Sequence, residues 1–138
     1  MMPAVEFAAA FAALAASHQA ADYWVQTPGQ ALEKGLSGWK GRRACLAHVA
    51  TYTATQAGFL AIAGLVLDVP FSVAAVAAGL AVSAATHYFA DRRAPLRCLA
   101  ARLGKGGFWD SDGGPLLDQA WHWTWLWVAA LVIAGVSA

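Results

Sequence analysis

Four long stretches of almost entirely apolar side chains leave this chain few ways to fold. They cover about residues 4–25, 44–67, 71–91 and 116–137, and the few charges in each stretch cluster at one end. A helix needs roughly 20 mostly apolar residues to cross a bilayer. The 138 residues are 59% hydrophobic and 12% charged, whereas about a quarter of the residues are charged in soluble domains. We therefore predict an all-α, polytopic membrane protein in which residues 1–138 form a single domain, a four-transmembrane-helix bundle.

Two other interpretations of the apolar stretches stay open. Small residues around Ala15-Ala16-Ser17 fit a cleavage site, so the first stretch could be a signal peptide. A secretory signal has Lys or Arg before its apolar segment, and residues 1–6 contain neither, which favours a membrane span. The second alternative is a soluble helical protein with a strongly apolar core.

The cations predict the topology. All nine Lys and Arg fall in two segments, one between the first two stretches and one between the last two. With four spans these segments share a side, and their positive charge assigns that side to the cytoplasm. Both termini and the short connection at residues 67–70 then lie outside. Residues 95–103 combine apolar side chains with spaced arginines, which predicts a short amphipathic helix on the cytoplasmic leaflet.

Every histidine of the chain lies near one end of an apolar stretch. Three of them stand four residues from an aspartate, as His18/Asp22, His87/Asp91 and, in reversed order, Asp118/His122, and the fourth is His48. Residues four apart share a helix face. The fourth stretch runs opposite to the first and third, so the reversed order places each histidine about 6 Å deeper than its aspartate. We therefore predict that the four histidines meet in one layer.

Buried ionisable side chains at a common depth need partners, and imidazole and carboxylate groups suit a divalent transition metal. We predict Zn first, with Fe or Mn as alternatives. The predicted ligands are His18, Asp22, His48, His87, Asp91, Asp118 and His122. One ion could take three histidines and a carboxylate, or two ions could share a bridging aspartate. The alternatives are a metal-free hydrogen-bond network, a proton relay and haem ligation by a histidine pair.

Other polar and aromatic side chains share faces with these residues. We expect them to hydrogen-bond to the cluster or to wall a pocket beside it, and they are Gln26, Thr51, Tyr52, Gln119, Trp121 and Trp125. Cys45 and Cys98 form no C-x-x-C pair and are expected to be reduced thiols. The segment Gly29–Arg43 is expected to be irregular, with at most a short turn. The Gly- and Asp-rich segment from Gly104 to Pro115 is expected to be a flexible connection.

The polar motifs carry a resemblance to a known family. SHQAADYWVQT in the first stretch resembles the H-x-x-x-D-x-x-x-Q-T opening of a bacterial and phage membrane family known only as domain of unknown function 3307. LAH, THYFAD and LLDQAWH in the later stretches are similar to that family's motifs and follow in the same order. The resemblance implies a four-helix membrane fold and a metal site. Similar proteins are labelled metal-dependent hydrolases. The segment Pro28-Gly29-Gln30 departs from the family pattern.

These observations predict a metal-dependent hydrolase of the bacterial inner (plasma) membrane that acts at the cytoplasmic leaflet. The carboxylates Asp22, Asp91 and Asp118 are the candidate catalytic groups, divided between metal ligation and general-base work. Arg92 and Arg93 either hold a phosphate or carboxylate of an amphiphilic substrate or serve only as topology determinants. A metal or ion carrier and a non-enzymatic accessory protein with a structural cluster are the alternative functions. Lipid is an expected partner, a homo-oligomer is compatible with the sequence, and no nucleic-acid partner is expected. The net charge of +1 hides the clustering of the cations and says nothing about nucleic acid.

Overall fold

A computed structural model describes residues 3–136, and within that range every regular element is a helix. The elements are α1 (Pro3–Ala20), the π-helical turn η1 (Ala21–Val25), α2 (Pro28–Glu33), α3 (Gly38–Leu67), α4 (Val73–Asp91), α5 (Ala94–Arg102), α6 (Gly106–Phe108), the π-helical turn η2 (Trp109–Gly113) and α7 (Gly114–Val136). The prediction of an all-helical fold is confirmed.

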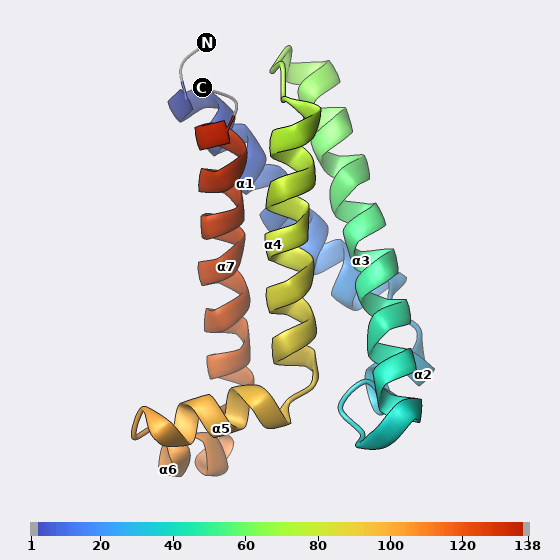
Figure 1. Ribbon diagram of the computed structural model, residues 1–138, viewed down its shortest axis with the longest axis vertical. Coiled ribbons are helices and arrows are strands. Elements are labelled where there is room, and N and C mark those ends of the chain that lie inside the picture. The colour runs from blue at the N-terminus through green and yellow to red at the C-terminus, as the bar shows by residue number, and fades with distance from the viewer. Residues whose placement is uncertain (1–2, 137–138) are drawn as a thin grey trace.

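The long helices α1, α3, α4 and α7 form an antiparallel bundle (Figure 1). Helix α7 packs against α1 and α4, and α3 packs against the same two helices from the other side. The start of α1, the end of α7 and the α3–α4 connection lie at one end of the bundle. The elements α2, α5 and α6 lie at the other end, so the fold gathers both basic segments there. The terminal residues 1–2 and 137–138, whose external location was predicted, lie outside the described residues.

Among the residues that the structure describes, two helices are long and apolar enough to cross a membrane, namely α3 and α4. In their most apolar 18-residue windows only 22% and 28% of the residues are buried. Large apolar side chains at the C-terminal end of α3 are exposed, and the exposed fraction of Leu65 is 84%. Helix α3 begins at Gly38, several residues before the predicted boundary, because nothing in Trp39–Arg43 opposes a helix. It ends at Asp68, which adopts the left-handed conformation (φ 52°) that aspartate tolerates.

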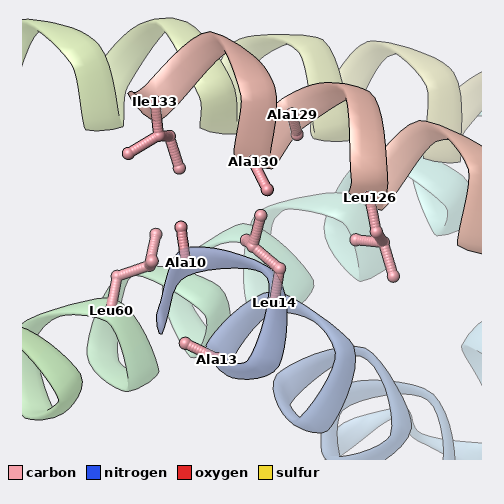
Figure 2. Close-up of a cluster of buried hydrophobic side chains, with 8 residues drawn as sticks. All are labelled: Ala10, Ala13, Leu14, Leu60, Leu126, Ala129, Ala130 and Ile133. Carbon is pink, nitrogen blue, oxygen red and sulfur yellow. The ribbon is translucent and has the colours of Figure 1, made fainter. Parts of the chain in front are cut away.

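The half of the bundle that holds the start of α1 and the end of α7 has an apolar core (Figure 2). Its buried side chains come from α1, α3 and α7 and are Ala10, Ala13, Leu14, Leu60, Leu126, Ala129, Ala130 and Ile133. Leu14 and Leu126 lie one helical turn from His18 and His122 along their helices, since four residues make about one turn. The apolar core therefore closes the histidine layer on the side away from the basic segments.

Both connecting segments of the basic end are more ordered than the sequence predicted. Pro28 begins α2 instead of only ending the first helix, because Thr27 and Gln30 form a capping box at its start. The segment expected to be a flexible connection contains α6 and η2. There Asp112 takes up a positive φ of 68°, and Asp110 forms an ion pair of 2.9 Å with Arg97 of α5. The segment from Gly104 to Pro115 therefore contains helical turns and an ion pair that its Gly- and Asp-rich sequence did not predict.

Candidate metal centre

The four histidines meet in the interior of the bundle, one from each long helix. Their exposed fractions are between 0% and 3%. The ring centroids of His48 and His87 are 5.0 Å apart, those of His87 and His122 are 4.5 Å apart, and those of His18 and His122 are 5.0 Å apart. The predicted common layer is therefore present, and it brings together α1, α3, α4 and α7.

Four donor atoms within this layer form a compact cluster, which we call the four-atom cluster: Oδ1 of Asp22, Nε2 of His48, Nε2 of His87 and Oδ2 of Asp91. His48 Nε2 lies 3.0 Å from His87 Nε2, 3.2 Å from Asp22 Oδ1 and 3.3 Å from Asp91 Oδ2. His87 Nε2 lies 3.6 Å from Asp22 Oδ1 and 3.1 Å from Asp91 Oδ2. Four ligands at about 2.0–2.1 Å from a tetrahedral Zn²⁺ ion would be about 3.3–3.4 Å apart. These five separations are close to that value, and Asp22, His48 and His87 form a group that could hold a metal ion, with Asp91 beside it.

Contacts within the protein account for only part of the cluster, where the Nε2 atoms of His48 and His87 form one hydrogen bond of 3.0 Å. The two carboxylate oxygens, Asp22 Oδ1 and Asp91 Oδ2, are buried and accept no well-aligned hydrogen bond. Burying a carboxylate without compensation costs several kcal/mol, about the penalty that drives such groups to pair or to bind metal. A divalent cation at the centre of the cluster would satisfy both oxygens and both imidazole nitrogens together. The donor set therefore fits the predicted metal ion.

Local backbone geometry places each ligand. His87 and Asp91 lie four residues apart on α4, on one face of a regular helix. Asp22 instead lies in η1, where the Gln26 N–H donates to the Ala21 carbonyl over five residues at 2.8 Å. A π-helical turn is rare and often marks a functional site. This wider turn carries Asp22 at the point where its two oxygens face different histidines, with Oδ2 3.4 Å from His18 Nδ1.

Lys34 contacts the cluster from the loop after α2, although no motif in the sequence marks it as a site residue. Its Nζ lies 2.9 Å from Asp91 Oδ1, the oxygen that faces away from the histidines. The side chain of Lys34 is 12% exposed. This ion pair fixes the orientation of the Asp91 carboxylate, a candidate ligand, and groups around metal ligands commonly have this role. Only the positive charge of the segment marked this position in the sequence.

The arginines after α4 have different surroundings. The guanidinium of Arg92 donates to the carbonyls of Lys34 and Leu36, at 2.6 Å in each case. It therefore ties the α2–α3 loop to the end of α4, which keeps Lys34 in reach of Asp91. Arg93 donates only one long hydrogen bond, of 3.4 Å, to Ala31. Of the two arginines suggested for substrate binding, Arg93 is the one that lines a pocket.

The other predicted neighbours divide into two groups. Gln119 lies within hydrogen-bonding reach of His18, and Gln26 lines the pocket described below, with its Nε2 buried and unpaired. Thr51 is exposed and donates to the His48 carbonyl at 2.9 Å, so it faces its own backbone.

The two predicted tryptophans lie apart from the cluster. Trp121 donates to the Thr86 carbonyl and stacks with Phe89. Trp121 and Trp125 line a separate apolar pocket beside α5. Cys45 and Cys98 are both free thiols.

Tyr52 packs directly on the histidine layer. Its ring stacks on that of His87 with centroids 3.7 Å apart. Its hydroxyl accepts a hydrogen bond of 2.9 Å from Gln56 Nε2 and lies 3.3 Å from the Ser83 hydroxyl. The residue is 1% exposed. Tyr52 therefore connects α3 to α4 on the side of the layer that faces the apolar core.

The Tyr52→Phe variant should be less stable but keep its metal. The substitution retains the ring on His87 and leaves the buried Gln56 amide without its acceptor, which costs about 1–3 kcal/mol of unfolding free energy. Denaturant unfolding of the purified protein, together with metal analysis, measures both effects. Thr51→Val is the matched control, because the Thr51 hydroxyl contacts only backbone carbonyls. Loss of metal from Tyr52→Phe would contradict this assignment and place the hydroxyl in the ligand set.

A pocket of about 520 Å³ opens beside the cluster at the basic end of the bundle. Four aspartates and two cations line it, namely Asp91, Asp110, Asp112 and Asp118 with Lys34 and Arg93. The side chain of Asp118 is 31% exposed, and its Oδ2 lies 3.5 Å from His122 Nε2. The pocket gives small molecules a route to two of the three predicted carboxylates.

The fold and the site define a class: helical proteins with a buried histidine and aspartate cluster that could hold a metal ion. The chain matches no protein-family model, no curated protein and no solved structure. The resemblance to domain of unknown function 3307 therefore depends on the motifs alone.

Proposed function

We propose that this chain is a metal-dependent hydrolase of the bacterial inner membrane that acts on an anionic, amphiphilic substrate at the cytoplasmic leaflet. The observation that carries the proposal is the four-atom cluster beside an open pocket. A buried group of donor atoms that could hold a metal ion supports the metal. A pocket lined by carboxylates and cations accounts for access by a substrate.

The exposed apolar surface supports the membrane location. A core helix of a soluble protein is mostly buried, but the apolar windows of α3 and α4 are mostly open. Side chains such as Leu65 and Val66, at 84% and 74% exposed, suit contact with lipid. We propose that α1 with η1, and α7, cross the bilayer beside them. The basic end then faces the cytoplasm, following the positive-inside rule.

The residues around the cluster suit hydrolysis. A bound divalent ion supplies Lewis acidity and lowers the pKa of a water ligand toward neutrality. Asp118 stands at the pocket wall as the carboxylate that can accept the proton from that water. Tyr52 and the apolar core close the opposite side of the histidine layer, so water reaches the cluster from the pocket. The substrate would enter from the basic end.

The proposed activity is tested with protein purified in detergent or placed in nanodiscs. Metal-free protein, prepared with a chelator, is loaded with Zn²⁺, Mn²⁺ or Fe²⁺ and offered a panel of phosphoester and carboxylic ester lipids. We expect hydrolysis of at least one anionic amphiphile, lost on chelation and restored by the same metal. Hydrolysis that is equal with and without metal, or no hydrolysis by metal-loaded protein, would overturn the proposal.

Arg93→Ala should weaken the binding of an anionic substrate more than it slows the reaction. The Arg93 guanidinium lines the pocket and makes one long hydrogen bond to the protein. Loss of one charge-assisted contact costs about 1.4 kcal/mol, or about tenfold in KM with kcat nearly unchanged. Steady-state kinetics measure both constants. Arg102→Ala, on the exposed surface of α5, is the control. An equal rise in KM for a neutral substrate in Arg93→Ala would argue against an anion site.

A structural metal centre is the second candidate function, and the closed ligand set favours it. Four protein ligands around one ion are typical of structural sites, whereas catalytic sites keep an open position. In that case metal would stabilise the bundle without any hydrolysis. A carrier has less support. The apolar core from Ala10 to Ile133 lies between the cluster and the far end of the bundle, and among the described residues only isolated buried polar side chains, such as Gln56 and Glu6, accompany it.

A further inference from the structure

A second group of metal-binding side chains lies directly beside the four-atom cluster. Donor atoms of His18, His87 and His122 all lie within 4.8 Å of one another. The three residues come from three different helices, and all are buried. His18 is informative because both of its ring nitrogens are buried, and neither makes a well-aligned hydrogen bond to its polar neighbours Asp22 and Gln119. A buried imidazole in this condition is a candidate metal ligand.

His87 belongs to both groups but can serve only one ion at a time. A neutral imidazole offers one nitrogen lone pair, and its other nitrogen carries a proton. His87 Nε2 is already part of the four-atom cluster. His18 on α1 and His122 on α7 therefore remain for another ligand, and their ring centroids are 5.0 Å apart.

Two carboxylates complete this second donor set. Asp22 directs Oδ1 to the four-atom cluster and Oδ2 to His18 Nδ1, 3.4 Å away. Asp118 Oδ2 lies 3.5 Å from His122 Nε2. Both distances are close to the separation of about 3.3 Å expected between neighbouring ligands of one tetrahedral ion. Asp22 is thus placed as a carboxylate bridge between two positions.

We propose that a second divalent ion binds between His18, His122 and Asp118, with Asp22 bridging it to the ion of the four-atom cluster. Two-metal sites of this kind hold their ions about 3.5–4 Å apart and clamp a substrate oxygen between them. Asp91 of the four-atom cluster and Asp118 of the second donor set both line the pocket, so both ions would border on the substrate. Asp118 then acts as a ligand instead of a base. The inference depends on the metal centre of the proposed function, but not on its reaction.

The number of bound ions tests the inference. Chelator-treated protein in detergent is titrated with Zn²⁺ or Mn²⁺, passed through a desalting column and analysed by elemental mass spectrometry. We expect two ions per wild-type chain, and one ion in His122→Gln and in Asp118→Asn. Trp123→Phe is the control, because Trp123 is 43% exposed and packs on Phe11, away from the site. This control should retain two ions.

Manganese spectroscopy supplies a second measurement that needs no variant. Two Mn²⁺ ions bridged by a carboxylate interact magnetically, so the resolved hyperfine lines of an isolated ion should collapse into a broad signal as the second equivalent binds. A wild-type stoichiometry of one, or two ions retained by both His122→Gln and Asp118→Asn, would overturn the inference. Two coupled ions without any hydrolysis would support it and overturn only the proposed reaction. Hydrolysis by protein that holds a single ion would support the proposed reaction and overturn the inference of a second ion.

Discussion

His87→Ala is expected to abolish tight metal binding and the stabilisation that metal gives to the bundle. His87 belongs to both donor groups and is 1% exposed. Its Nε2 contacts the other three atoms of the four-atom cluster, at distances from 3.0 to 3.6 Å. The three side chains that its Nε2 contacts, Asp22, His48 and Asp91, are already members of that cluster and cannot take its place.

The expected size of this effect follows from mass action. A ligand at 100 times its Kd stabilises the folded protein by about 2.7 kcal/mol, which corresponds to about 10 °C in Tm for a domain of this size. We expect Zn²⁺ to raise the Tm of the wild type by about that amount. The Tm of His87→Ala should rise by less than about 2 °C when Zn²⁺ is added. Thermal unfolding with and without a chelator measures both shifts.

Comparison within each protein separates metal binding from packing. His87→Ala also loses the stacking contact with Tyr52, so its metal-free form will unfold earlier than metal-free wild type. Only the rise in Tm on adding Zn²⁺ measures the stabilisation that the bound ion gives. Trp127→Phe, on the half-exposed face of α7, should keep the full increment. An equal Zn²⁺ shift in wild type and His87→Ala would rule out the four-atom cluster as the binding site.

The helices and the histidine layer could be predicted because they depend on periodicity. Positions four apart lie on one helix face in any regular helix, so His87 and Asp91 had to point the same way. Because the fourth apolar stretch runs opposite to the first and third, Asp118 must precede His122 in the sequence for the two pairs of residues to lie at the same depth. These two regularities predict that the pairs meet, but they do not predict which atoms approach one another.

The remaining parts of the site depend on local geometry that no repeat encodes. Lys34 reaches Asp91 only because Arg92 ties the α2–α3 loop to the end of α4. The π-helical turn that carries Asp22 has no glycine or proline to signal it. Thr51 and Tyr52 share a side at helical spacing, yet only Tyr52 has a ring long enough to reach His87. Contacts between segments distant in sequence therefore had to come from the structure.

Gly79→Ala is expected to destabilise the protein from a position far from the metal ligands. A Cβ atom at Gly79 of α4 would lie 2.5 Å from Cγ1 of Ile133 and 2.9 Å from the Ala129 carbonyl oxygen, both on α7. Ile133 could rotate, but the carbonyl belongs to a buried helix backbone and cannot. The two helices must move apart, which costs about 1–3 kcal/mol of unfolding free energy.

Gly58→Ala provides the matched control. Gly58 lies within α3, and a Cβ atom there meets nothing within 4 Å. Alanine favours a helix over glycine by about 0.5–1 kcal/mol. We therefore expect Gly58→Ala to be neutral or slightly stabilising and Gly79→Ala to be clearly destabilising. Denaturant unfolding of both variants in the same detergent measures the difference.

The Gly79 variant also tests whether helix packing sets the geometry of the metal site. Gly79 precedes His87 by about 12 Å along α4, and α7 carries His122, whose ring lies 4.5 Å from that of His87. Separating α4 from α7 widens this contact, and each 1.4 kcal/mol lost from binding weakens affinity about tenfold. We expect about tenfold weaker metal binding in Gly79→Ala and no change in Gly58→Ala. Unchanged affinity in a destabilised Gly79→Ala would show that the ligands hold their positions independently of the α4–α7 contact.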